Sequence, residues 1–247
     1  MTHLFHYGKD IIYLLFLLIF IHTLLSLKKK SIVSNQTLKP FSKKNWLMII
    51  IIIIVIELLF IFFLDRPITL HCVLAHCEKF GLTYSALFET APMLLLVVIL
   101  YLISFFKDTQ SEFHKISKIA AINFVVVLFI GGIIKVILMR ERPFVSINPQ
   151  SFFHYHEMLS HHVDFFMSMP SGHVLRISAI LMPFIFYFRN IITRAIFPLI
   201  ILFASVCRVM SFEHWTSDVI LSVFITFSVT YFVMDTLIQT RSKRSRY

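Results

Sequence analysis

The sequence predicts an all-α fold, a polytopic bundle of transmembrane helices, and two observations support this prediction. Of the 247 residues, 58% are hydrophobic and 15% are charged, whereas a soluble globular protein is about half apolar and about a quarter charged. The apolar residues also form long runs, and a helix needs ~20 apolar residues to cross a bilayer. Seven runs approach or reach that length: 11–27, 46–64, 88–106, 119–138, 173–188, 191–208 and 216–237.

The number of spans depends on the first run, 11–27, which is short and contains His22. If this run lies only in the membrane interface, six core helices remain and the other spans keep their sidedness. If it crosses, the bundle has seven spans. A cleaved signal peptide is not expected, because Met1–Asp10 carries one lysine and the lysine triplet follows the apolar run.

The net charge of +10 raises the question of nucleic-acid binding, which the distribution of the basic residues answers. Most of them lie in segments that seven crossings place on one face: Lys28, Lys29, Lys30, Lys39, Lys43, Lys44, Lys107, Lys115, Lys118, Arg189, Arg194, Arg241, Lys243, Arg244 and Arg246. The positive-inside rule makes that face cytoplasmic. The basicity therefore indicates topology, with the amino terminus outside and the carboxyl terminus in the cytoplasm, and no nucleic-acid partner is expected.

Two cysteines, Cys72 and Cys77, lie in the predicted outer stretch Asp65–Glu89. Disulfides persist outside the cytoplasm, so a disulfide between them is one prediction and two free thiols are the other. A third interpretation is a metal tetrad, because His71 and His76 directly precede the two cysteines.

The other long outer stretch, Phe144–Met169, is rich in aromatic and histidine side chains: Phe152, Phe153, His154, Tyr155, His156, His161, His162, Phe165 and Phe166. Aromatic residues at the water boundary favour the headgroup layer, so the stretch is expected to rest on lipid. A lid over a site is the second interpretation. A metal site is the third, although the histidines lack a regular ligand spacing.

The first of three polar clusters at the outer ends of the runs consists of Lys135 and Arg142-Pro143. A lone lysine near a helix end usually snorkels its ammonium group towards the headgroups. Arg142 follows one or two turns later, and Pro143 is expected to end the helix. The cluster thus places two cations at one outward-facing helix terminus, where they suit an anionic headgroup.

The second cluster, Pro170-Ser171-Gly172-His173, opens the fifth run. Proline suits the first turn of a helix, and the free N–H groups of a helix amino terminus favour phosphate. Gly172 permits close backbone approach, Ser171 adds a hydroxyl, and His173 can donate or take up a proton.

In the third cluster, Arg208 closes the sixth run, and His214 and Asp218 begin the seventh. Residues four apart on a helix share a face, so Asp218 can hold one imidazole nitrogen and leave the other free to react. That arrangement suits a nucleophilic or general-base histidine. The simpler alternative is a boundary histidine beside a helix-starting aspartate.

The three clusters read KxxxxxxRP at 135–143, PSGH at 170–173 and RxxxxxHxxxD at 208–218. In order and spacing they resemble the type 2 phosphatidic acid phosphatases, the membrane branch of a superfamily shared with vanadium haloperoxidases. By length and layout the chain is similar to bacterial members such as phosphatidylglycerophosphatase B and undecaprenyl pyrophosphate phosphatases.

This resemblance implies a role for each matched residue. His214 would attack phosphorus to form a phosphohistidine, with Asp218 orienting it, and His173 would protonate the leaving oxygen and later activate water. The groups that would hold the phosphoryl oxygens, and so stabilise charge in the transition state, are Lys135, Arg142, Arg208, Ser171 and the Gly172 amide. The resemblance implies no metal and no other cofactor.

Three positions depart from the family pattern. Cys207 stands where many members have serine, Phe212 where many have glycine, and Thr216 where many have proline. None of these changes removes a proposed catalytic group, and Phe212 is expected to reshape the opening for lipid.

Two charged residues of the predicted spans lie outside the motifs. Arg176 lies one turn below His173 on the same helix face, so we expect it to reach a second phosphate, a pyrophosphate or a sugar and to help to select the substrate. Glu57 lies inside the second span, where a carboxylate is costly, and is expected to be protonated or paired in helix packing.

The sequence therefore predicts one integral-membrane domain over 1–247, with amino-terminal helices and an outer loop in 1–110, a catalytic core in 119–237 and a basic cytoplasmic tail in 238–247. The expected activity is hydrolysis of a lipid phosphate or pyrophosphate at a periplasmic active site of a bacterial-type inner membrane. Undecaprenyl pyrophosphate and phosphatidylglycerophosphate are the main candidate substrates, followed by phosphatidic acid. The alternatives are a lipid A phosphatase, a lipid-to-lipid phosphotransferase and, from another class, a non-catalytic lipid binder or a transporter.

Overall fold

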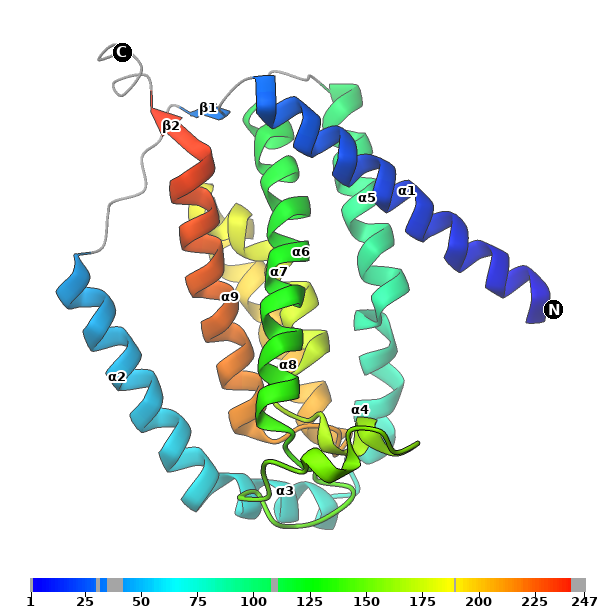
Figure 1. Ribbon diagram of the computed structural model, residues 1–247, viewed down its shortest axis with the longest axis vertical. Coiled ribbons are helices and arrows are strands. Elements are labelled where there is room, and N and C mark those ends of the chain that lie inside the picture. Colours follow the sequence, from blue (N-terminus) through cyan, green and yellow to red (C-terminus); the bar gives the residue numbers. More distant parts are fainter. Residues whose placement is uncertain (1, 30–31, 35–41, 108–110, 189, 241–247) are drawn as a thin grey trace.

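The structure is a computed structural model that describes residues 2–29, 32–34, 42–107, 111–188 and 190–240 (Figure 1). Within these ranges the regular secondary structure is helical apart from one pair of short strands, which confirms the predicted all-α membrane bundle. In the described part, four helices are long and apolar enough to cross a membrane: Lys44–Leu74, Glu112–Leu138, Ile192–Met210 and Thr216–Leu237. A fifth span results if the bent pair Glu78–Phe88 and Thr90–Phe106 counts as one.

Each of the seven predicted runs forms a helix. These helices are α1 (Thr2–Lys29), α2 (Lys43–Leu59), α5 (Thr90–Lys107), α6 (Glu112–Leu138), α7 (Gly172–Tyr187), α8 (Phe197–Met210) and α9 (Thr216–Leu237). A π-helical turn, η1 (Phe60–Leu64), continues α2, and another, η5 (Ile192–Ile196), precedes α8. The 16 residues of α7 rise about 24 Å, which is less than the ~30 Å hydrocarbon core of a bilayer.

The outer stretch between α2 and α5 folds into two short helices, α3 (Asp65–Leu74) and α4 (Glu78–Ser85), followed by the 3₁₀ turn η2 (Ala86–Phe88). Helix α4 packs on α8. Cys72 and Cys77 are free thiols in this structure. Among the described residues, no three His, Cys, Asp or Glu side chains gather as metal ligands do, so the tetrad interpretation has no support.

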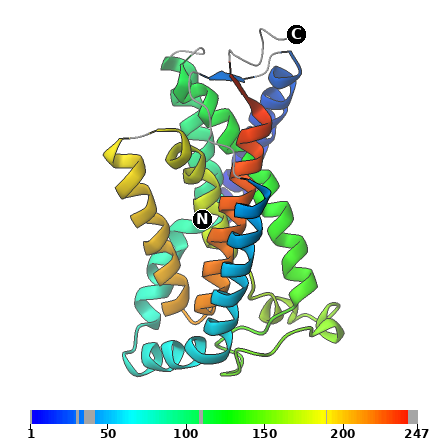
Figure 2. The ribbon, with the colours of Figure 1, turned by 90° about the vertical axis from the view of Figure 1, so that its left-hand side faces the viewer.

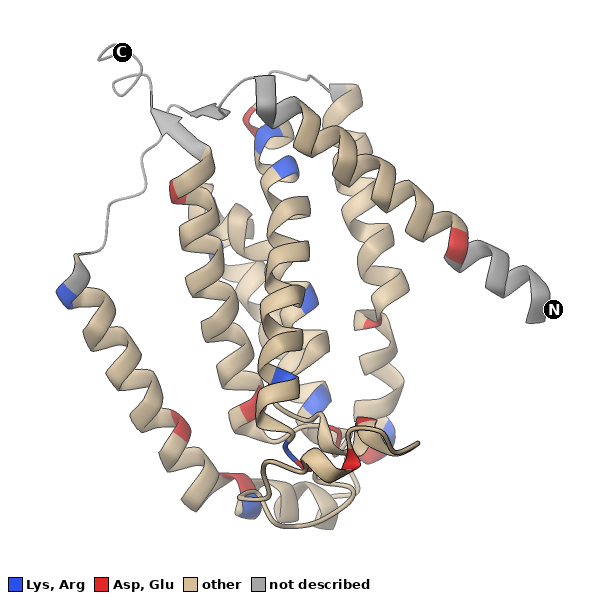
Figure 3. Ribbon diagram, in the orientation of Figure 1, with Lys and Arg blue, Asp and Glu red and all other residues tan. Residues whose placement is uncertain are grey.

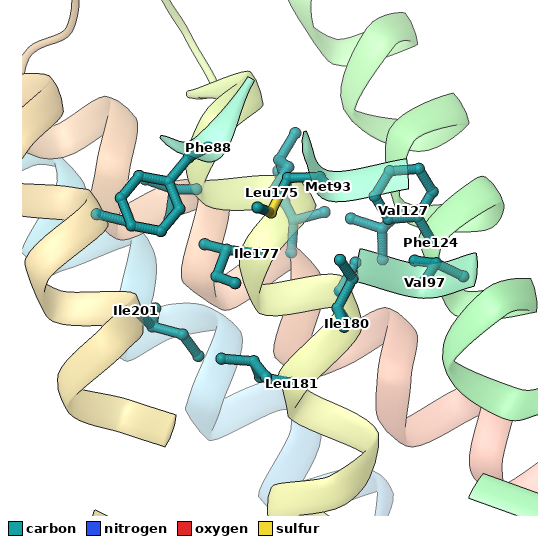
Figure 4. Close-up of a cluster of buried hydrophobic side chains, with 14 of the residues drawn as sticks. Phe88, Met93, Val97, Phe124, Val127, Leu175, Ile177, Ile180, Leu181 and Ile201 are labelled. Carbon is teal, nitrogen blue, oxygen red and sulfur yellow. The ribbon is translucent and has the colours of Figure 1, made fainter. Parts of the chain in front are cut away.

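The interior of the bundle is formed mainly by α6, α7 and α9, which pack on one another. Figure 4 shows Ile180 of α7 on the side of the helix that faces Phe124 and Val127 of α6, while Ile177 of α7 lies on the side of Phe88 and Ile201. Lipid is as apolar as these side chains, so close packing and interhelical hydrogen bonds hold the helices together. Asn123 of α6, for example, donates to the Ala179 carbonyl at 2.8 Å.

The two ends of the bundle differ in composition. At one end, where α5 ends and α6 begins, strand β1 (Ile32–Ser34) pairs in parallel with β2 (Ile238–Thr240) (Figures 1 and 2). At the other end lie α3, α4 and the loop after α6, where many charged residues gather (Figure 3). Lys30, Lys39 and the basic tail 241–247 lie outside the described residues.

The helix ends at the three motifs differ from the predictions. Helix α6 ends at Leu138 because Met139 adopts a left-handed conformation with φ 38°, so Pro143 does not end it. Pro170 precedes Ser171, the N-cap residue of α7, and therefore lies outside the first turn. His214 lies in the turn before α9, so it does not share a helix face with Asp218 as predicted.

Candidate active site

One cavity of about 280 Å³ brings residues of all three motifs together at the charged end of the bundle. It is lined by Glu89, Lys135, Arg142, Gly172, His173, Arg176, Arg208, Glu213 and His214. Two histidines thus share a small space with four basic and two acidic side chains. Such a cavity attracts anions.

His214 is held in a defined tautomer. Its Nδ1 lies 2.7 Å from the Ser168 carbonyl oxygen, which can only accept, so Nδ1 carries the proton and Nε2 carries a lone pair. Burial lowers the pKa of His214 well below its usual range, and the nearby cations Arg208 and Arg142 lower this pKa further. The imidazole is therefore neutral at pH 7, as a nucleophile has to be.

Asp218 lies behind His214 and does not line the cavity. Its Oδ2 is 3.6 Å from His214 Nδ1, beyond hydrogen-bond distance, where we had predicted a direct contact. The carboxylate instead accepts hydrogen bonds from the Trp215 amide at 2.8 Å, the Ser168 hydroxyl and Arg140. Asp218 is still close enough to stabilise positive charge on the imidazole ring.

His173 lies in the first turn of α7. Its Nε2 is 3.3 Å from Glu89 Oε1 but forms no hydrogen bond with any described residue. Glu89 directly precedes α5 and its side chain is 57% exposed. His173 thus offers an uncommitted ring nitrogen beside a carboxylate, which suits the transfer of a proton.

The basic side chains of the cavity are held by backbone carbonyls and by Glu213. Lys135 Nζ donates to the Met167 carbonyl at 2.5 Å, and Arg142 Nε donates to the Asp164 carbonyl at 2.8 Å. Glu213 forms ion pairs with both Arg142 and Arg208, the second at 3.0 Å. The positions of the cations are therefore set before any ligand binds.

Three other predicted residues differ in their relation to the cavity. Arg176 lines it, and its Nη1 donates to the Phe88 carbonyl at 3.0 Å. Ser171 is fully buried, does not line the cavity, and its hydroxyl has no partner among the described residues. Glu57 lies elsewhere, in α2, with both carboxylate oxygens buried and unpaired within the described part of the chain.

Residues 116–241 match the PAP2 superfamily. The chain belongs to this superfamily. The matched region begins in α6 and contains all of α7, α8 and α9, and therefore all three motifs. No curated protein and no solved structure matches the chain, so the similarity to phosphatidylglycerophosphatase B and undecaprenyl pyrophosphate phosphatases stays a prediction.

The loop 144–169 of this PAP2 protein serves as a scaffold for the cavity. Its last residues supply the carbonyls that bind the side chains of Arg142, Lys135 and His214. The loop also presents a fully exposed leucine, Leu159, at 99% exposure. The exposed leucine agrees with the predicted contact of this loop with lipid, which stays a prediction. The carbonyl contacts give the loop a second, structural role that was not predicted from the sequence.

The polar partners around the PAP2 motifs were not identified from the sequence. They are Asp65, Glu89, Arg140, Ser168 and Glu213. Arg140 and Glu213 occupy variable positions within two of the motifs, and Asp65 and Glu89 border predicted spans. The sequence feature that could have pointed to the charged partners is a charged residue at the end of an apolar run, because such a charge is costly unless it is paired.

A larger groove of about 850 Å³ lies outside the cavity and shares no lining residue with it. Its walls are formed by apolar side chains of α2, α3, α7, α8 and α9, including Ile53, Ile68, Met182, Leu202 and Phe224. This groove can accept hydrocarbon, but it offers no catalytic groups.

Proposed function

We propose that this protein is a membrane-embedded phosphatase that cleaves a lipid phosphate or diphosphate through a phosphohistidine on His214. The observation that carries the proposal is a neutral, buried His214 in a cavity with four basic side chains, at the end of an apolar helix bundle. Membership in the PAP2 superfamily supports a phosphoric ester hydrolase. The helix bundle supports a substrate that resides in the bilayer.

In the proposed first step, Nε2 of His214 attacks phosphorus, and the bond between phosphorus and the lipid oxygen breaks. His173 donates a proton to that oxygen as it leaves. The imidazole becomes a cation, which Asp218 stabilises from 3.6 Å. Lys135, Arg142 and Arg208 neutralise the charge that develops on the phosphoryl oxygens.

In the second step, water attacks the phosphohistidine, and His173, now neutral, accepts a proton from that water. The phosphorus–nitrogen bond breaks and inorganic phosphate leaves. Each step uses side chains that line the cavity, together with Asp218 behind His214. We therefore expect turnover without a metal ion or other cofactor.

The proposed orientation places the cavity on the periplasmic side and the lysine-rich connections in the cytoplasm. Lys135, which lines the cavity, lies in the last turn of α6, whereas Lys115 and Lys118 lie near the start of the same helix, at the other end of the bundle, as this orientation requires. The substrates we favour are undecaprenyl pyrophosphate and phosphatidylglycerophosphate, because both carry an anionic headgroup on hydrocarbon chains that remain in the bilayer.

The test is phosphate release by the purified protein in EDTA from four lipids: undecaprenyl pyrophosphate, phosphatidylglycerophosphate, phosphatidic acid and lipid A. Release from at least one lipid should survive chelation and vanish in His214→Ala. His156→Ala is the matched control, because the His156 side chain is 73% exposed. Loss of release in EDTA, or an active His214→Ala, would contradict the proposal. Transfer of the phosphoryl group to a second lipid would identify a phosphotransferase instead.

Arg176 is proposed to select the headgroup, since it adds a fourth basic side chain beside the three expected for one phosphoryl group. Arg176→Ala should lower kcat/KM for a diphosphate more than for a monophosphate, by about tenfold for one charge-assisted hydrogen bond. Arg66→Ala, which removes an exposed arginine, is the control. An unchanged ranking of lipids in Arg176→Ala would refute this role.

A further inference from the structure

Arg140 lies in a variable position of the first motif, yet it is completely buried and does not line the cavity. One of its nitrogens, Nη1, donates to Asp218 and, at 2.7 Å, to the Ser217 hydroxyl. The other, Nη2, donates to Asp65 at 2.8 Å and to the Pro149 carbonyl at 2.7 Å. Arg140 therefore joins two buried carboxylates directly behind His214.

Asp65, the first residue of α3, closes the network from the other side. It is also completely buried, and it accepts hydrogen bonds from the Ser217 amide at 3.0 Å and from the Ser217 hydroxyl at 2.5 Å. Since Ser217 directly precedes Asp218, the Asp65 carboxylate fixes the first turn of α9. The network thus links a helix outside the PAP2 match to the segment that carries His214.

We infer that Arg140 and Asp65 are positioning residues that keep Asp218 ionised and directed at His214. This inference rests on the proposed phosphatase function and deepens it. A buried carboxylate without a cation takes up a proton more readily, and a neutral Asp218 would not stabilise an imidazolium. Arg140 supplies that cation. Asp65 holds the Arg140 guanidinium in place by accepting a hydrogen bond from its Nη2.

The other ionisable groups near Asp218 are few. His214 is 3.6 Å away, and Glu57 of α2 and Lys135 of α6 act on Asp218 at longer range. In the described part of the chain, Arg140 is the one cation that forms an ion pair with Asp218. Loss of Arg140 would leave the Asp65 and Asp218 carboxylates buried together without the cation that pairs with both, which favours uptake of a proton by one of the two.

The deciding variants are Arg140→Met, Asp65→Asn, the double variant and, as a matched control, Arg66→Met, which removes the exposed neighbouring arginine. Arg140→Met should lower kcat at pH 7 by about 100-fold, the scale expected for an uncompensated buried charge. KM should change by less than about threefold, because Arg140 does not line the cavity in which substrate is proposed to bind. Arg66→Met should behave as the wild type.

The pH profile separates positioning from simple support of the fold. In Arg140→Met, kcat should rise with pH more steeply than in the wild type, because the two carboxylates left without their cation share a proton that is lost as pH rises. The double variant should recover about tenfold relative to Arg140→Met, because it lacks the second carboxylate. A wild-type pH profile in Arg140→Met, or no recovery in the double variant, would overturn the inference.

A second readout does not depend on turnover. In Arg140→Met the folded state would bind a proton more tightly than the unfolded state, so stability should be present at low pH and lost as pH rises. Relative to the wild type, the Tm of Arg140→Met in detergent should therefore decrease as pH rises from 5 to 8, and this relative decrease should be smaller in the double variant. An inactive wild type would refute the proposed function, while these melting curves would still decide the network.

If Arg140→Met does not fold, Arg140→Lys keeps the charge without the two-pronged geometry of the guanidinium. It should lose about tenfold in kcat, the order of a lost second hydrogen-bonding prong, and regain part of this when combined with Asp65→Asn. No change in kcat for Arg140→Lys, or no recovery with Asp65→Asn, would overturn the inference.

Discussion

Glu213, the residue before His214, binds both of the arginines that are proposed to hold phosphate. Its carboxylate forms ion pairs with Arg142 and Arg208 inside the cavity. A phosphoryl group that enters the cavity therefore has to compete with an anion that is already there. Glu213 keeps the arginines in position, and in the proposed mechanism it would also weaken their binding of substrate and product.

Glu213→Gln keeps the shape of the side chain and removes its charge. Inhibition by inorganic phosphate should strengthen, with the inhibition constant falling about tenfold, because the arginines lose their internal partner. Inhibition measured at constant ionic strength checks this, with the exposed Glu78→Gln as the control. Unchanged or weaker inhibition would show that Glu213 does not compete with phosphate.

Phe212 has a backbone conformation that bulky residues rarely adopt, with φ 57°. Glycine populates this region without a steric penalty, and many family members have glycine at this position. A phenylalanine in place of glycine therefore strains the backbone next to His214, and such strain typically lowers the stability of the fold by ~1–3 kcal/mol.

The effect of substitutions at Phe212 on the Tm should depend on the backbone conformation at this position rather than on the packing of the side chain. Phe212→Val should lower the Tm by several degrees, because a β-branched residue fits this conformation worst, whereas Phe212→Gly should stay close to the wild type. Thermal unfolding in detergent measures both. A lower Tm for Phe212→Gly than for Phe212→Val would show that side-chain packing outweighs the strain.

The motif residues that line the cavity could be singled out because their spacing is distinctive, whereas their partners could not. Lys135, His173 and His214 lie far apart in the sequence, and the cavity brings them together. Arg140 could not be recognised, because its two carboxylate partners are 75 and 78 residues away. Such contacts depend on tertiary packing, which one sequence does not encode as a local pattern.

At the scale of elements, the contact of α4 with α8 holds the turn that carries His214. A Cβ atom placed on Gly81 of α4 would lie 2.3 Å from the Ser211 nitrogen and 2.8 Å from the Cys207 carbonyl oxygen. Both are backbone atoms, which cannot rotate away as a side chain can. Glycine is therefore required at this crossing.

Gly81→Ala should separate α4 from α8, lower the Tm and reduce activity by tenfold or more, on the order of the 1–3 kcal/mol cost of overpacking. Gly132→Ala is the matched control, because a Cβ atom there meets no atom of the described residues within 4 Å. In a helix interior, alanine is also more stabilising than glycine by ~1 kcal/mol. Melting curves and phosphate release of both variants test the prediction. A Gly81→Ala protein as stable as Gly132→Ala would rule out the tight crossing.

The helices themselves were predictable from apolar runs, but several of their ends were not. Helix α6 ends at the left-handed Met139, and the chain then returns so that the Arg142 amide donates to the Phe165 carbonyl at 2.9 Å. Neither Met139 nor Phe165 is a usual helix-ending signal. The position of Arg142 is thus set by a contact with a distant loop.

At the scale of the whole molecule, the fold places the cavity at the end of α6 that carries Lys135, opposite the end that carries Lys115 and Lys118. The apolar helices between them suit a multi-pass membrane protein. Because the reactive groups lie at an end of the bundle, a headgroup can reach them while its hydrocarbon chains stay in the bilayer. The same placement buries His214, at 2% exposure, in a positively charged cavity.

The burial of His214 links the stability of the molecule to pH. The pKa of His214 is lowered in the folded state, by burial first and by the nearby cations second, while the unfolded chain has a value of about 6.5. The unfolded state therefore binds a proton that the folded state does not. Stability from this source is present above pH ~6.5 and is lost as pH falls below it.

The Tm of the wild type in detergent should accordingly fall as pH is lowered from 7 to 5, and it should fall less in His214→Gln. His156→Gln is the control, because the side chain of His156 is 73% exposed and its loss should leave the full pH dependence. Equal pH dependence in the wild type and His214→Gln would mean that His214 takes up a proton in the folded state. The neutral nucleophile on which the proposed chemistry depends would then be confined to higher pH.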